Sequence, residues 1–191
     1  GILPVYVRNY GQDAAVLKRF RGSNFARPTE AALNLAFTGL SDWMLIGLKY
    51  KNEKDQEVQR TVLYIEKDPV TLLGHKVRKH VLGTDPKDDP VVYDEQDESF
   101  YVELDVSKDD RYLYIYSSST VSSEQRYADV SDPKLEFRVI LPRERDHEYL
   151  ADHFDGRWIL RTNWKAPNFR LMEVAVAESA DRSKWLELVA H

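Results

Sequence analysis

The segment 147–153, HEYLADH, combines histidines and acids, the residue types that bind zinc in many hydrolases. The zinc-peptidase motif H-E-x-x-H needs its second histidine four residues after the first, so that one turn of helix brings both imidazoles to the metal. Position 151 is an alanine, and the motif is incomplete. In an extended strand and turn, His147 and His153 would share a face but lie six residues apart, too far for one ion. We therefore assign both histidines structural roles.

Other candidate ligands lie in the first half of the chain. His75 and His80 fall on opposite faces of a strand-like run, because successive side chains alternate in extended backbone. Asp85, Asp88 and Asp89 form an acidic loop that offers oxygen ligands for calcium, but it contains prolines and no glycine among the acids, unlike an EF-hand. We interpret it as a solvated turn. The sequence predicts no metal site and no cofactor.

Hydroxyl groups gather in residues 116–125, YSSSTVSSEQ. A serine becomes a nucleophile when a histidine or lysine is placed to activate it, and no such residue lies nearby in the sequence. We expect these hydroxyls to satisfy strand ends and a turn. No catalytic residue is therefore assigned in this chain, and its binding residues are unknown from the sequence.

These candidates lie within a repeated pattern of strands. Strand-like runs occur as second strands at 62–65, 112–116 and 158–162, as long polar third strands at 75–82, 124–130 and 168–174, and as short fourth strands at 91–93, 137–141 and 185–189. The next units open at 100–102 and 147–150. Four strands in about 46 to 49 residues are typical of a β-propeller blade.

The repeat predicts an all-β, β-propeller-like fold with about three four-stranded antiparallel blades, at about 42–96, 97–143 and 144–191. Turn-forming residues at 107–111 and 155–157 join first to second strands as hairpins. Residues 51–59, KNEKDQEVQ, read as a charged loop within the first blade. The aromatic residues of the strands are expected to pack between blades, although a tunnel that touches peptide is the alternative: Phe100, Tyr112, Tyr114, Tyr116, Trp158 and Trp185.

The N-terminal segment, residues 1–41, follows another pattern. VYVRNY at 5–10 could form a strand, whereas 12–22 and 27–39 are rich in helix-forming residues and each ends in glycine. We expect two short helices, the second capped by Thr29. An innermost strand within 29–38 is the alternative, because LNLAF alternates.

Composition limits the class of protein. A chain of 191 residues with 42% apolar side chains can bury a full core, so we expect one domain or one piece of a larger domain. The net charge of -5 comes without blocks of like charge, which argues against nucleic acid, and no run of 18 apolar residues suggests a membrane span. The absence of cysteine favours a reducing compartment, the cytoplasm, with the periplasm as the alternative.

Several segments in order carry a family resemblance, among them HVLGTD, SSEQRY, HEY and NFRL. Over about residues 60–191 the chain resembles the β-propeller of the oligopeptidase B branch of the prolyl oligopeptidase family, serine peptidases that cut short peptides. The resemblance implies two partners, short peptides and a C-terminal α/β-hydrolase domain that holds the Ser-Asp-His triad.

The sequence lacks the nucleophile elbow that marks the triad domain. A nucleophile elbow, G-x-S-x-G, needs two glycines four residues apart, and no two of the eight glycines have that spacing. We therefore expect a chain that is inactive alone and forms the non-catalytic propeller portion of a serine-type oligopeptidase, gating the access of short peptides. A free-standing propeller-like module that binds proteins or peptides is the alternative, and an independent hydrolase is disfavoured.

Three blades alone do not close a ring, since closure takes at least about four. The open faces would expose apolar surface, whose burial is worth about 25 cal/mol per Å². We expect either residues 1–40 to cap the open side or two copies to complete each other as a homo-oligomer, and we favour the homo-oligomer.

Overall fold

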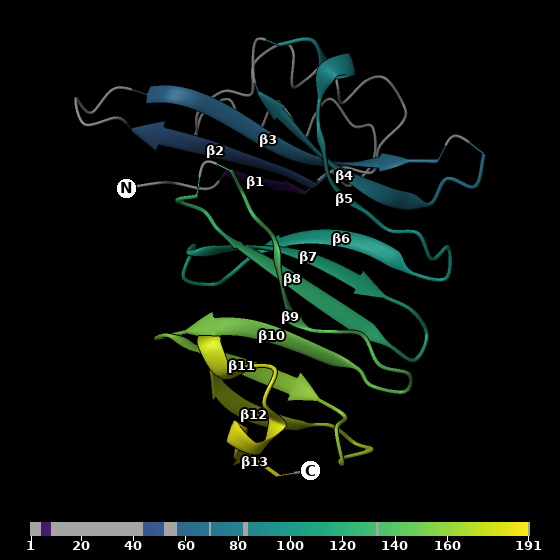
Figure 1. Ribbon diagram of the computed structural model, residues 1–191, viewed down its shortest axis with the longest axis vertical. Coiled ribbons are helices and arrows are strands. Elements are labelled where there is room, and N and C mark those ends of the chain that lie inside the picture. Colours follow the sequence, from purple (N-terminus) through teal and green to yellow (C-terminus); the bar gives the residue numbers. More distant parts are fainter. Residues whose placement is uncertain are drawn as a thin grey trace. The chain divides into compact units, whose positions relative to one another are not determined.

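The computed structural model describes residues 5–8, 44–51, 57–68, 70–81, 84–132 and 134–190. The chain divides into two compact units, residues 1–98 and 99–191 (Figure 1). The expected helices at 12–22 and 27–39 lie outside the described residues. In the described part of the chain, the regular structure is strand apart from short 3-10 turns, and no helix there is long and apolar enough to cross a membrane.

The first unit contains one antiparallel sheet whose strands follow chain order. Its strands are β1 (Val5–Arg8), β2 (Met44–Lys51), β3 (Glu57–Lys67), β4 (Gly74–Val81) and β5 (Val91–Asp94). The strand expected in VYVRNY is present as β1 and pairs with β2. This sheet therefore has five strands rather than four.

The second unit contains two four-stranded sheets, each again in chain order. The second sheet comprises β6 (Tyr101–Val106), β7 (Tyr112–Ser118), β8 (Ser123–Asp129) and β9 (Arg138–Leu141). The third comprises β10 (Tyr149–Phe154), β11 (Arg157–Thr162), β12 (Arg170–Ala175) and β13 (Leu186–Val189). All neighbouring strands are antiparallel, which confirms the predicted all-β fold.

Local sequence explains the third sheet's first hairpin. Asp155 and Gly156 have positive φ angles of 47° and 76°, as a tight two-residue hairpin turn between twisted strands requires. Glycine adopts this conformation at little cost and aspartate tolerates it better than most residues. The turn places His153 and Trp158 opposite each other on the paired strands.

Several strand boundaries differ from the predictions, and two of the differences have a clear structural reason. β3 begins at Glu57, inside the segment expected as a charged loop, because ladder pairing with β2 overrides the polar composition of 57–59. Trp185, expected to begin the last strand, lies just before β13, where its indole Nε1 donates to the Ser179 carbonyl at 3.0 Å. Backbone partners, which local composition does not reveal, decided both boundaries.

The main core of the second unit lies between its two sheets (Figure 1). Alternation along β10 points Tyr149, Ala151 and His153 into this core, where each is at most 4% exposed. The opposite face of the third sheet is open, with Leu150 and Phe154 exposed by 52% and 63%. Candidate residues of the second unit, among them His153, therefore lie at the joint between the second and third sheets.

Candidate functional site

Two side chains of β8 bind backbone N–H and carbonyl groups of β10, as the backbone of a paired strand would. The Ser123 hydroxyl accepts from the Tyr149 N–H at 2.7 Å and donates to the Tyr149 carbonyl at 2.8 Å. The Gln125 amide donates to the Ala151 carbonyl and accepts from the Ala151 N–H, both at 2.8 Å. Both side chains are 1% exposed. The SSEQRY segment thus fastens one sheet to the next through four buried hydrogen bonds.

The side chain of Tyr149, in the third sheet, in turn binds backbone groups of the second sheet. The β8–β9 ladder has a bulge between Gln125 and Arg126, which leaves backbone groups without ladder partners. The Tyr149 hydroxyl fills this gap: it accepts from the N–H groups of Gln125 and Leu141 at 2.8 and 3.2 Å and donates to the Leu141 carbonyl at 2.7 Å. Burial raises the pKa of Tyr149 well above its usual value, so the phenol stays protonated.

An aromatic cluster fills the joint beside these hydrogen bonds. The fully buried Trp158 ring lies 5.4 Å from Tyr112 and 4.9 Å from Tyr127, measured between ring centroids. Five of the six predicted aromatic core residues are at most 7% exposed, and Tyr116 is half-buried. Edge contacts between rings add to their burial, and Tyr112, Tyr114, Trp158 and Trp185 belong to the core between the two sheets.

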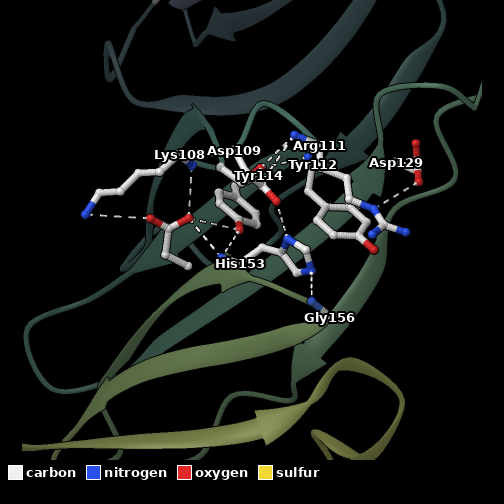
Figure 2. A network of polar contacts seen from close by, with 10 residues as sticks. Lys108, Asp109, Arg111, Tyr112, Tyr114, Asp129, His153 and Gly156 are labelled. Atoms are coloured by element: carbon white, nitrogen blue, oxygen red, sulfur yellow. Dashed lines mark hydrogen bonds and ion pairs between the residues drawn. The ribbon is translucent and has the colours of Figure 1, made fainter.

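His153 anchors the opposite end of the joint to the β6–β7 hairpin (Figure 2). Its Nδ1 lies 2.6 Å from Asp109 Oδ2, and its Nε2 accepts from the Gly156 N–H at 3.1 Å. Since Nε2 accepts, the neutral ring carries its proton on Nδ1 and donates it to Asp109. Burial alone would raise the pKa of Asp109, but hydrogen bonds from Ser107, His153 and the Arg111 N–H outweigh it and lower that pKa.

Asp152, the residue before His153, binds the same hairpin. Its Oδ1 accepts from the backbone N–H of Lys108 at 3.2 Å, and its Oδ2 lies 3.8 Å from the Lys108 ammonium. The Tyr114 hydroxyl accepts from the His153 N–H at 3.0 Å. Burial, followed by the nearby Asp152 charge, raises the pKa of Tyr114 far above its usual value. Neighbouring residues of β10 thus hold one hairpin of the second sheet.

Ser107, Asp109 and His153 are the three residue types of a serine-peptidase triad, but their order is wrong for catalysis. The Ser107 hydroxyl donates to Asp109 at 2.6 Å and accepts from the N–H groups of Arg111 and Tyr112. His153 contacts the carboxylate with Nδ1, and its Nε2 is bound to Gly156. A triad needs the serine proton to pass to that second nitrogen. The cluster is built to hold the hairpin.

The candidate histidines lie apart from one another and bind different partners. His147 lies before β10 and His153 lies near its end, and they bind different partners, Thr162 and Asp109. In the first sheet, His75 is partly exposed beside Asp94, and His80 is fully buried with its Nδ1 2.8 Å from Asp89 Oδ1. The structure brings neither histidine pair together.

The acidic loop is partly buried, unlike the solvated turn that the sequence suggested. Asp85 caps a 3-10 turn, η2 (Pro86–Asp88), by accepting from the Lys87 N–H at 3.0 Å. Asp89 points inward, is 5% exposed and accepts from the Tyr64 hydroxyl at 3.0 Å. Among the described residues, no group of three potential ligands is arranged to hold a metal ion.

Sequence reasoning missed the residues that make the joint. Gln125 and Tyr149 carry its central hydrogen bonds, and neither was singled out as functional. Their partners across the joint include residues 24 to 26 positions away in the chain, and the other partner of Tyr149, Leu141, is eight positions away, so no local pattern reveals them. The available signal was the run of polar residues 122–125 at the start of a predicted polar strand, where hydroxyl and amide groups can bind the backbone of a neighbouring strand.

Comparison with known proteins gives a consistent result. The family model described as "Prolyl oligopeptidase, N-terminal beta-propeller domain" matches residues 50–191. Dipeptidyl aminopeptidase BI of Pseudoxanthomonas mexicana is 47% identical over 133 residues, which cover 69% of this chain and 18% of the relative. Protease 2 of Moraxella lacunata is 25% identical over 109 residues, covering 57% and 16%. The chain therefore spans less than a fifth of these relatives' length.

Solved structures share the arrangement of strands. Oligopeptidase B from Leishmania major superposes with a TM-score of 0.64 at 19% identity, covering 85% of this chain and 28% of the other. Oligopeptidase B from Trypanosoma brucei, with covalently bound antipain, gives 0.62 at 22% identity, covering 78% and 23%. At these identities the likeness shows the fold.

Proposed function

Because the chain belongs to the prolyl oligopeptidase family, as part of its N-terminal β-propeller domain, we propose that it gates the access of short peptides to a catalytic domain. In this proposal, a serine-type α/β-hydrolase domain elsewhere in the whole protein performs the chemistry. The far greater length of the curated relatives supports this division of labour.

The joint between the second and third sheets carries the proposal. Its central polar side chains, Ser123, Gln125 and Tyr149, all bind the backbone of the neighbouring sheet. Parting the two sheets would strip partners from all these groups, each costing about 1–3 kcal/mol when left buried and unsatisfied. Such a joint favours a rigid wall, and a rigid wall excludes substrates by size without doing chemistry.

The predicted blades, about 42–96, 97–143 and 144–191, follow the same proposal, and β1 from the segment 1–41 adds a fifth strand to the first sheet. The open face of the third sheet, which includes Leu150 and Phe154, needs a cover. Because the relatives are much longer than this chain, we favour further sheets of the whole protein as the cover of this face. A homo-oligomer stays a prediction. The cysteine-free composition supports a cytoplasmic location.

Substrate size tests the gate in the whole protein. We expect a fluorogenic peptide of a few residues to be cleaved at least about tenfold more efficiently, in kcat/KM, than the same sequence displayed on a folded domain, which corresponds to about 1.4 kcal/mol. The reason is that a rigid propeller admits only narrow, flexible chains. Steady-state kinetics on both substrates measure the ratio.

Loosening the joint between the second and third sheets should reduce the ratio of kcat/KM for the short peptide to kcat/KM for the folded substrate. The variant Gln125→Met removes both hydrogen bonds to Ala151, whereas Gln96→Met changes an exposed glutamine and serves as the matched control. The proposal requires the ratio to fall in the first variant and to stay at the wild-type value in the second. Equal cleavage of both substrates by the wild-type protein would contradict gating.

A further inference from the structure

His147 lies just before β10, where hydrogen bonds fix the nitrogen that carries its proton. Nδ1 is 3.1 Å from Arg182 Nη2, and a guanidinium can only donate, so Nδ1 is the bare nitrogen. The proton of the neutral ring is therefore on Nε2, which lies 2.9 Å from Thr162 Oγ1. That oxygen also accepts from the Trp164 N–H at 3.1 Å. The 4% exposed ring is thus held from both sides in its neutral form.

Two charged groups face this ring from the described elements around it. Arg182 lies against Nδ1, and Glu144 binds the same guanidinium at 2.6 Å. The other neighbours are neutral: the Tyr149 ring stacks at 5.5 Å between centroids, and the Ser123 N–H donates to the His147 carbonyl at 3.1 Å. A proton added to Nδ1 would point directly at the arginine.

Arg182 lies in the segment that connects β12 to β13 and holds this segment in place. It begins a 3-10 turn, η4 (Arg182–Lys184). Its guanidinium carbon lies 5.7 Å from the Trp164 ring centroid and 5.9 Å from that of Trp185. The Trp185 N–H donates to the Arg182 carbonyl at 3.3 Å, and the Trp185 ring belongs to the core between the sheets.

We propose that His147, Thr162, Arg182 and Glu144 form an acid-sensitive latch: protonation of His147 expels Arg182, and η4 detaches from the start of β10. Glu144 then changes partner, from the departing guanidinium to the new imidazolium. The latch is independent of the proposed gating function, because it depends only on contacts within the third sheet and its connections.

The direction of the pH effect follows from the latch geometry. Burial lowers the pKa of His147 below 6.5, and Arg182 lowers it further, while Glu144 partly offsets both. The unfolded or detached state, with its ordinary histidine pKa, takes up the proton first. The latch is therefore fully stable above about pH 6.5 and weakens as the pH falls through the lower pKa of the closed state.

Hydrogen exchange of the intact protein, corrected for the intrinsic pH dependence of exchange, tests the latch. We expect amides of residues 181–185 to lose about tenfold of their protection between about pH 7.5 and pH 5, because the open form takes up the proton more readily than the closed form and gains population as the pH falls. In His147→Gln, a neutral amide can donate to Thr162 and accept from Arg182 without titrating. Protection in this variant should not depend on pH.

His75→Gln is the matched control, because His75 is partly exposed and pairs with Asp94 in the first unit. It should keep the wild-type loss of protection in residues 181–185. Equal loss in His147→Gln and wild type, or no loss in wild type, would overturn the proposal.

The imidazole nitrogens give a second readout that does not depend on the variants. Nitrogen-15 NMR at about pH 7.5 should show His147 as the Nε2–H tautomer, with Nδ1 unprotonated. A ring that is already doubly protonated at that pH, or that carries its proton on Nδ1, would also overturn the latch.

Discussion

Replacing Tyr149 with phenylalanine should lower the free energy of unfolding by about 2–4 kcal/mol, since each buried group left without a partner costs about 1–3 kcal/mol. The substitution removes only the hydroxyl, which serves two backbone N–H groups and one carbonyl at the β8–β9 bulge. These groups belong to Gln125 and Leu141, and the ring that remains in place keeps water from reaching them.

Urea unfolding followed by tryptophan fluorescence measures this loss, and an unchanged slope would show that the comparison is between similar unfolded states. Tyr101→Phe is the matched control, because Tyr101 is 62% exposed on β6, and it should change stability by less than about 0.5 kcal/mol. A Tyr149→Phe variant as stable as the control would mean that the hydroxyl is not needed at the bulge.

Gln125→Met is the second large expected effect, again about 2–4 kcal/mol. Methionine has a similar length but offers no amide, so the N–H and the carbonyl of Ala151 lose their partners across the joint. Because both groups belong to the backbone of β10 and their partner is a side chain of β8, we expect the loss to loosen the two sheets relative to each other. The result would be less protection of β10 amides in hydrogen exchange as well as lower stability.

Gln96→Met is the control for this change, because Gln96 is exposed. It should leave both stability and the exchange of β10 amides near wild type. If Gln125→Met instead unfolded at the same urea concentration as the control, the joint would be held by its aromatic cluster and the side-chain to backbone pairing would be dispensable.

The strands were readable from the sequence where alternation and turn chemistry agreed. β7 and β11 follow from short apolar runs, and Asp155-Gly156 marks the hairpin between β10 and β11. The family resemblance was confirmed by the match over residues 50–191. The start of β3 was missed because the polar residues 57–59 are strand only through pairing with β2. A strand boundary that depends on a partner far away in the sequence cannot be predicted from local composition.

The joint was less predictable for the same reason. The sequence suggested that the hydroxyls of 116–125 satisfy strand ends and a turn, and Ser119 does bond the nearby Ser122 carbonyl. Ser123, however, binds Tyr149 in another sheet, 26 residues away. Likewise, Asp89 was assigned to a solvated loop but reaches the buried His80. A polar side chain's partner is decided by packing between elements, which only the folded structure reveals.

The location of the reactive serine tests the central claim most directly. Treating the intact protein with a serine-reactive phosphonate and mapping the modified residue by mass spectrometry asks where the chemistry resides. The account predicts inactivation with a single modified serine outside residues 1–191, because Ser107 and Ser123 are bound within the fold. Inactivation through a modified serine within residues 1–191 would contradict a non-catalytic role for this chain.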